Sequence, residues 1–390
     1  MRKVLVLSTS RGDARGLSAL AAELDARPGM EVRAVVSESA APGWQWLTPG
    51  GRPAITMVKT GLPPGTSSEM VAGAHRLADA TLDAITAGVD LLVVMGDRHE
   101  LLPAHQVALI SRVPVAHLSG GDITEGAFDD SIRHAISKLA DLHFCSTAES
   151  ARRLHQMGEE PGRVHVSGEP ALDLLARDVA ATLSPEPWQS LGISVRRPAA
   201  LLTYHPPTNN PQLLIPELEA CFAAAAEFET VVATHPSSEP GAAEIVARLD
   251  SWSAGRDGAV VVPQLGLNYP AVLSQVDAVI GNSSSGVVEA ATFSCPVIDV
   301  GDRQRGRLHP ANVVHVPGDP GAATKAAKQV LGPVFRQGLE GLVNPYGDGH
   351  AAKRITDVIC ALGELPPKGF VDVAPNLLLW PREPRPVGGD

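Results

Sequence analysis

The chain has 390 residues, 44% hydrophobic and 19% charged, which is ordinary for a globular protein and excludes a disordered or fibrous class. The net charge of −11 argues against nucleic-acid binding, which requires clustered lysine and arginine. No apolar run reaches the roughly 18 residues that cross a bilayer, and the four scattered cysteines form no CxxC pair. We therefore expect a cytoplasmic protein without membrane segments or disulfides.

The first half of the chain predicts alternating strands and helices. Short apolar runs that end in polar residues predict strands, and alanine- and leucine-rich stretches predict helices. The strands are expected at 3–8, 31–37, 90–97, 114–122, 142–146 and 163–168, and the helices around 17–24, over about 67–87 and from 129. This alternation is typical of a parallel, doubly wound sheet.

A second series of the same kind follows a proline-containing stretch without periodicity at 183–197, which we interpret as a linker. Further strands are expected at 199–206, 229–236, 258–265, 277–286 and 295–303. The chain is thus predicted to be α/β with two Rossmann-like doubly wound domains facing a cleft, over 1–182 and 183–345. A proline-rich tail at 366–390 is assigned no chemistry.

One set of residues indicates an anion site in the second half. The segment VDAVIGNSSSGVVEA places Ser283, Ser284 and Ser285 where a strand turns into a helix, with Glu289 further on. A single serine would suffice for ordinary N-capping, so three favour phosphate binding. Arg303 follows the next strand in GDRQRGR, where forked donors suit phosphate oxygens. Neither a P-loop lysine nor a GxGxxG motif accompanies them.

Acidic residues gather after the strands of the first half. Asp97 lies in GDRHE, and Asp122, Glu125 and Asp129 lie in GGDITEGAFDDSIRHAISK. Asp129 and Arg133 are four apart on one helical face, so they are expected to pair. Carboxylates that share a pocket divide into acid and base because their repulsion separates their pKa values. We interpret this set as a catalytic wall opposite the anion wall.

Histidines add one candidate but no metal site. His205, in LLTYHPP, follows the first strand of the second domain and could donate to a diphosphate or leaving group. His235, in ATHPSS, has an equally good structural interpretation. The chain lacks HExxH or HxH spacing, so no metal is expected.

These motifs together resemble a known family. GDRHE, HLSGGDITEGAFDDSIRHAISKLADLHF, YHPPT, GNSSSGVVEA, GDRQRGR and NPYGDGHAAKRI stand in the order seen in the hydrolysing UDP-N-acetylglucosamine 2-epimerases of sialic-acid-type pathways. The resemblance covers about residues 1–362. It implies a glycosyltransferase-B type fold whose last helix, about 346–365, crosses back to the first domain, and catalysis without a metal or dissociable cofactor.

The resemblance also implies the roles of individual residues. The family's UDP-binding positions map onto Arg11, His205, Ser283, Ser284, Glu289 and Arg303, and its acidic catalytic region onto Asp97, Asp129 and Asp122. The implied chemistry is removal of the C2 proton with anti elimination of UDP, followed by hydration. Together with the residues singled out from the sequence, the candidate catalytic residues are Asp97, Asp129, Asp122, His205 and Arg133, and the candidate binding residues are Arg11, Arg98, Glu125, Ser237, Ser283, Ser284, Ser285, Glu289 and Arg303.

Several positions depart from the family pattern. Ser39 and Ser119 stand where relatives often have histidine or an acidic residue, Asp122 replaces the usual glutamate, and Ser237 replaces a common asparagine. A sugar nucleotide, most simply a UDP-sugar, is the expected ligand, and a homo-oligomer (dimer or tetramer) is the expected assembly. Three alternatives stay open: a glycosyltransferase of the same fold, a related nucleotide-sugar hydrolase with altered sugar or base specificity, and a catalytically weakened sugar-nucleotide-binding protein.

Overall fold

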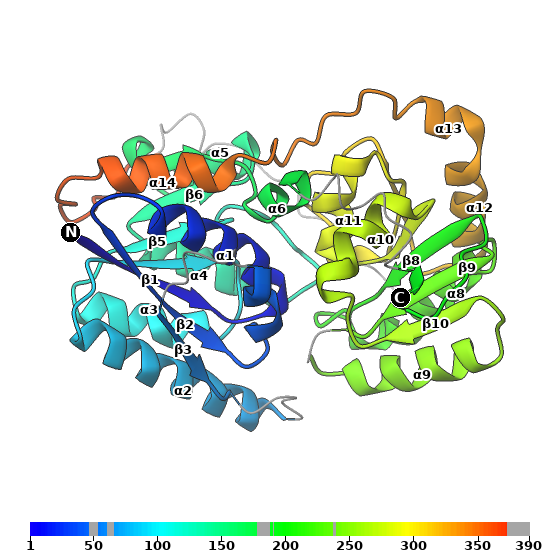
Figure 1. Ribbon diagram of the computed structural model, residues 1–390, viewed down its shortest axis with the longest axis horizontal. Coiled ribbons are helices and arrows are strands. Elements are labelled where there is room, and N and C mark those ends of the chain that lie inside the picture. Colours follow the sequence, from blue (N-terminus) through cyan, green and yellow to red (C-terminus); the bar gives the residue numbers. More distant parts are fainter. Residues whose placement is uncertain (47–53, 61–65, 178–187, 190, 237–238, 373–390) are drawn as a thin grey trace.

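The computed structural model describes residues 1–46, 54–60, 66–177, 188–189, 191–236 and 239–372. They form two lobes, each built on a parallel sheet covered by helices (Figure 1). The linker expected at 183–197 and the tail expected at 366–390 lie partly outside these ranges.

The first sheet has seven parallel strands in the order β3-β2-β1-β4-β5-β6-β7. Their sequences are short and apolar, and β4 is buried at every position, as expected of a parallel sheet covered on both faces. Val4 of β1 lies opposite Val32 on one side and Leu91 on the other, which fixes the register. The strands are β1 Arg2–Ser8, β2 Met30–Ser37, β3 Ala54–Val58, β4 Leu91–Met95, β5 Val115–Leu118, β6 Leu142–Cys145 and β7 Val164–Val166.

Helices cover both faces of this sheet. The first begins directly after Ser10, whose hydroxyl and the Asp13 carboxylate form a reciprocal capping box. The helices are α1 Arg11–Asp25, α2 Ser67–Thr86, α3 Leu101–Ile110, α4 Asp129–Leu139, α5 Ala148–Gln156 and α6 Ala171–Arg177, with 3-10 turns η1 Ala41–Trp46 and η2 Pro161–Arg163.

The second sheet has six parallel strands in the order β10-β9-β8-β11-β12-β13. The strands are β8 Ala199–Thr203, β9 Thr230–Thr234, β10 Ala259–Val262, β11 Ala278–Gly281, β12 Val297–Val300 and β13 Val313–Val316. The helices are α8 Leu214–Ala225, α9 Ala242–Ala254, α10 Tyr269–Gln275, α11 Ser284–Glu289, α12 Pro320–Leu331 and α13 Pro333–Gln337, with 3-10 turns η4 Pro211–Leu213, η5 Gly266–Asn268, η6 Ala290–Phe293 and η7 Asp302–Gln304.

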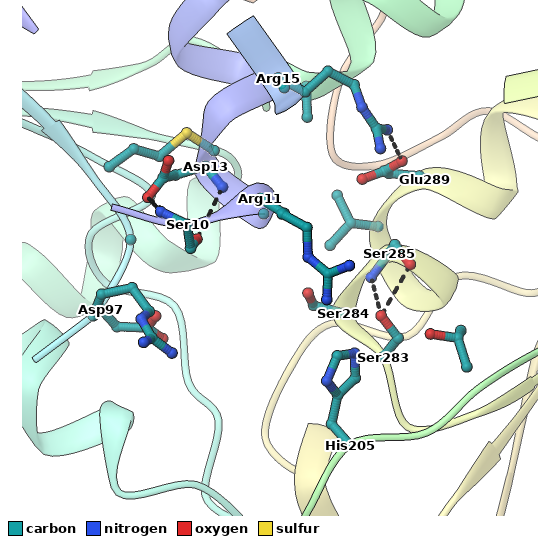
Figure 2. Close-up of a pocket in the computed structure, with 18 of the residues that line it drawn as sticks. Ser10, Arg11, Asp13, Arg15, Asp97, His205, Ser283, Ser284, Ser285 and Glu289 are labelled. Atoms are coloured by element: carbon teal, nitrogen blue, oxygen red, sulfur yellow. Dashed lines mark hydrogen bonds and ion pairs between the residues drawn. The ribbon is translucent and has the colours of Figure 1, made fainter. Parts of the chain in front are cut away.

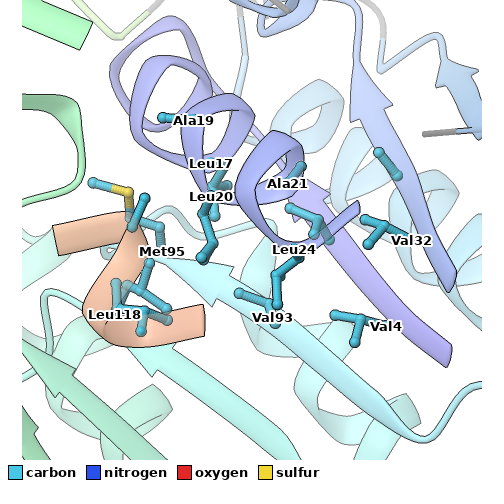
Figure 3. Packing of buried hydrophobic residues seen from close by; sticks show 14 of the residues in the cluster. Val4, Leu17, Ala19, Leu20, Ala21, Leu24, Val32, Val93, Met95 and Leu118 are labelled. Carbon is cyan, nitrogen blue, oxygen red and sulfur yellow. The ribbon is translucent and has the colours of Figure 1, made fainter. Parts of the chain in front are cut away.

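The final helix, α14 (Ala351–Ala361), returns to the first lobe and packs beside α1 (Figure 1). Its Ala352, Ile355 and Ile359 are fully buried in the core that α1 forms with the sheet. Figure 3 shows the α1 side of that core, where Leu17 and Leu20 point at the sheet. Burying one such leucine contributes roughly 1.5–3 kcal/mol.

The predicted fold is confirmed, with two additions. β3 and β13 were not expected from the sequence, and both lie at an edge of their sheet. The first helix also starts earlier than predicted, so Arg11 lies in its first turn rather than in a preceding loop.

The segment after α14 runs along the first lobe. The Nζ atom of Lys368 donates to the carbonyl oxygens of Lys138 and Ala140, and to the buried Glu159 carboxylate. Burial alone would raise the pKa of Glu159, but hydrogen bonds from His143, Lys138 and Lys368 lower it to about 2. This contact fastens the described part of the tail to the first domain.

Candidate active site

A cavity of about 630 Å³ lies between the two lobes, at the carboxyl ends of the strands. Ligands of doubly wound sheets bind at this edge, where the strand order reverses about β1 and β8. Figure 2 shows side chains from α1 and the β4 loop on one side, and from the β8 and β11 loops on the other. Both domains therefore contribute to one site.

The second domain supplies a wall of hydrogen-bond donors. Ser283 caps α11, and its hydroxyl lies 3.0 Å from that of Ser285. The backbone of His205 is held by Asn282, which accepts from its N–H at 2.7 Å and donates to its carbonyl at 2.9 Å. Burial and the nearby Arg303 lower the pKa of His205 to about 3, so its ring is neutral and can donate one hydrogen bond. These groups suit the oxygens of an anion.

Arg11 reaches from the first domain to the second. Its guanidinium donates to the carbonyl oxygens of Pro263 at 3.1 Å and Pro236 at 3.2 Å, and Figure 2 shows it near Ser284 and His205. The turn that carries Arg11 is fixed by Asp13, which accepts hydrogen bonds from the residues just before the helix.

One helical turn later, Arg15 makes a second contact across the cleft. Its Nη1 lies 2.5 Å from a carboxylate oxygen of Glu289, and its guanidinium lies 4.5 Å from the centre of the Tyr269 ring. Both side chains of the ion pair are largely buried. The two domains are therefore joined by a charged contact at the edge of the candidate nucleotide site.

The first domain supplies the carboxylates. Asp97, in the loop after β4, is held by the guanidinium of Arg133. Asp129 begins α4, faces the cavity and is 6% exposed, and its Oδ1 has no hydrogen-bond partner among the described residues. Burial, and next the charge of Asp97, raise the pKa of Asp129 to about 7 against the opposing effect of Arg98. Asp129 is thus a carboxyl group poised to exchange a proton near neutral pH.

Asp122 lines the same cavity, and its carboxylate already has partners. It accepts a hydrogen bond from the Ser150 hydroxyl at 2.6 Å, and Arg307 of the other domain lies 3.8 Å away. Beside it, Ser119 adopts a left-handed backbone with φ of 60° and donates to Glu169 at 3.0 Å. Burial, and next the charge of Asp122, raise the pKa of Glu169 to about 7.

Most of the sequence-predicted residues come together at this cavity. Those that line it are Arg11, Asp97, Arg98, Asp122, Asp129, Arg133, His205, Ser283, Ser284, Ser285, Glu289 and Arg303, together with His235. Ser237 lies outside the described residues.

Two expectations need correction. Glu125 does not line the cavity, because its carboxylate binds Arg305 of the other domain at 2.7 Å. The expected pair of Arg133 with Asp129 is wrong: Arg133 binds Asp97 and lies 3.6 Å from Asp130, its i−3 neighbour. The partner of Arg133 lies in the loop after β4, and residue spacing within α4 alone could not predict a partner from another segment.

Several residues of the cavity were not predicted as site residues, among them Arg15, Glu169, Glu239 and Arg307, although Arg307 belongs to the same GDRQRGR segment as Arg303. The rule that function follows strand ends could have found Glu169, three residues after β7. Arg15 stands four residues after Arg11, so it shares its helical face. The other two reach the site through loops whose course depends on the fold.

The described residues contain no group of histidine, cysteine and acidic side chains that could hold a metal ion. Within the same ranges, no helix is both long and apolar enough to span a bilayer.

Comparison with known proteins gives a consistent result. The family model described as UDP-N-acetylglucosamine 2-epimerase matches residues 66–360. The chain is 33% identical over 229 residues to the GDP/UDP-N,N'-diacetylbacillosamine 2-epimerase (hydrolyzing) of Campylobacter jejuni, covering 58% of this chain and 59% of the relative. It is 31% identical over 267 residues to the UDP-N,N'-diacetylbacillosamine 2-epimerase (hydrolyzing) of Legionella pneumophila, covering 68% and 69%.

The fold is shared more widely than the sequence. The UDP-GlcNAc 2-epimerase of Neisseria meningitidis, solved with UDP-GlcNAc bound, superposes with a TM-score of 0.78 at 17% identity, over 92% of this chain and 99% of that one. On the family match and the shared two-domain fold, the chain belongs to the UDP-N-acetylglucosamine 2-epimerase family.

Proposed function

We propose that the chain is a hydrolysing 2-epimerase of a UDP-N-acetylglucosamine-like sugar nucleotide, which releases UDP and N-acetylmannosamine or a related 2-epimerised amino sugar. One observation carries this proposal. The carboxylates of Asp97 and Asp129 line a single cavity together with Arg303, His205 and the α11 serines of the other domain. A base and a leaving-group site thus face the same space.

The chemistry needs both walls at once. The proton on C2 of the sugar is weakly acidic, so its removal by a carboxylate must accompany departure of the diphosphate from C1. The electron pair of the C2–H bond forms the C1=C2 double bond, and the pair of the C1–O bond leaves with UDP. Arg303 and neutral His205 would stabilise the charge that develops on the leaving oxygen.

Hydration completes the reaction. The oxygen of water adds to C1 of the 2-acetamidoglucal, and a proton adds to C2 from the face opposite to the one that lost it. One water is consumed, and the free sugar carries the inverted configuration at C2. Asp129, with its raised pKa, is suited to remove the C2 proton in the first step, and the proton that returns to the opposite face comes from a second donor.

The names of relatives support the assignment to hydrolysing 2-epimerases, and they add diacetamido sugars to the substrates that should be tested. Two relatives are named as hydrolyzing 2-epimerases of N,N'-diacetylbacillosamine nucleotides, and one of these names includes GDP as well as UDP. Other relatives are named UDP-N-acetylglucosamine 2-epimerase without the hydrolysing description. We include a cytoplasmic location and a homo-oligomeric state in the proposal, on the strength of composition and resemblance.

The deciding experiment incubates the protein with a panel of UDP- and GDP-linked 2-acetamido and 2,4-diacetamido sugars in heavy water, without an acceptor, and analyses the products by mass spectrometry. A hydrolysing epimerase releases free nucleotide and a 2-epimerised sugar with one deuterium at C2. Release of little nucleotide would favour a glycosyltransferase. Binding of the panel without turnover would favour a catalytically weakened binding protein, and either result would overturn the proposal.

A further inference from the structure

A buried carboxylate that the proposed reaction does not use lies inside the candidate anion site. Glu239 follows β9 in the second domain, lines the cavity, and has a side chain that is 5% exposed. Its Oε1 lies 3.7 Å from Nη1 of Arg98 and 3.8 Å from Nη2 of Arg303. Arg98 belongs to the first domain and Arg303 to the second, so one carboxylate faces cationic groups from both sides of the cleft.

The charge balance explains why a carboxylate lies there. The side chains of Arg98 and Arg303 are 16% and 13% exposed, and burying guanidinium groups without a counter-ion is costly. Arg98 also pairs with Glu100 at 3.0 Å, so the counter-charge of Glu239 matters most for Arg303. A nucleotide diphosphate would supply the same counter-charge through the same forked donors. It would also repel Glu239 if the carboxylate kept its place beside those donors.

We propose that Glu239 is an internal ligand of the anion site, which holds Arg98 and Arg303 when the cleft is empty and is displaced when the phosphates of a nucleotide bind. The inference rests on the proposed function, since it takes the diphosphate to be the ligand of these two arginines. It gives Glu239 a role in release as well as in binding. The returning carboxylate competes with product UDP for the same donors.

The proposal predicts an unusual effect of removing an active-site charge. The apparent dissociation constant of a ligand is its intrinsic value divided by the fraction of molecules whose site is open. If Glu239 occupies the arginines in about nine molecules of ten, Glu239→Gln tightens UDP binding about tenfold. Uridine, which lacks the phosphates, gains little from the substitution.

Calorimetric titration of the 390-residue chain with UDP and with uridine tests this. Glu100→Gln is the matched control, because Glu100 binds Arg98 at 3.0 Å but does not line the cavity. We expect Glu239→Gln to bind UDP about tenfold more tightly than wild type, and Glu100→Gln to change the affinity at least threefold less than that. If Glu239→Gln has a lower melting temperature than wild type, Glu239→Ala repeats the test, because alanine puts no polar side chain in the buried position.

Each outcome decides the matter. Tighter UDP binding confined to the Glu239 variants supports the internal ligand. Unchanged or weaker UDP binding overturns it, as does an equal gain in Glu100→Gln, which would indicate a general effect of charge. A wild-type protein that binds no UDP would instead refute the proposed function, so the two failures are distinguishable.

Discussion

Asp129→Asn tests the assignment of the base most directly. The side chain faces the cavity with one carboxylate oxygen unpartnered among the described residues, so the amide fits the same space without breaking a contact there. Because burial and the charge of Asp97 raise the pKa of Asp129 to about 7, its carboxylate can accept the C2 proton and release it again near neutral pH. The substitution removes that acceptor.

The expected loss is large in turnover and small in binding. A positioned base contributes about 100-fold to 10,000-fold, so kcat should fall by that factor while UDP affinity stays within about twofold. In the wild type, kcat/KM should fall about tenfold per pH unit below 7, because protonation of Asp129 removes the base.

The assay couples UDP release to an optical readout and follows deuterium at C2 by nuclear magnetic resonance. Asp130→Asn is the matched control, since Asp130 is the next residue of α4 but does not line the cavity. Near-normal turnover and C2 exchange in Asp129→Asn, or an acid limb that the substitution leaves in place, would show that another group is the base.

Three further outcomes are expected. Arg303→Ala should weaken UDP binding about tenfold or more in calorimetry, because a charge-assisted hydrogen bond typically contributes roughly 1.5–3 kcal/mol; unchanged affinity would remove Arg303 from the site. Asp97→Asn should lose most turnover and move the acid limb of the residual activity to lower pH, since the charge of Asp97 raises the pKa of Asp129; an unmoved limb would contradict this coupling. Glu159→Gln should cost about 3 kcal/mol of unfolding free energy at pH 7, from a pKa lowered from 4.5 to about 2. That contribution is fully present above pH 4.5 and is lost as the pH falls through about 2, so urea unfolding should show the deficit shrinking in acid, and a deficit independent of pH would refute it.

The parts of the fold that the sequence predicted are those whose signal is local. Strands such as β1 and β4 are short apolar runs closed by polar residues, and a buried parallel strand needs no other pattern. β3 was missed because its side chains are almost all exposed, so it carries no burial pattern and is extended through its pairing with β2. β13 is four residues long, partly exposed, and paired only with β12 among the described strands.

The candidate site also contains residues that could be predicted from the sequence and residues that could not. Residues directly after strands, such as Asp97 and His205, could be predicted because topology alone brings parallel strand ends to one edge. The partners of those residues could not. Arg133 binds Asp97 in a loop 36 positions earlier in the chain, a pair that depends on how α4 packs within the first domain. Arg15 meets Glu289 across 274 positions, a pair that depends on the packing of the two domains.

The return of α14 to the first lobe has a consequence for how the chain matures. Ile355 and Ile359 fill a core whose buried residues outside α14 lie between Val4 and Leu174, so during synthesis an apolar groove beside α1 stays uncovered until this helix emerges from the ribosome. A chain cut before position 351 would leave that groove uncovered. The core of the first lobe is therefore complete only after the chain of the second lobe has been synthesised, even though each lobe has its own sheet.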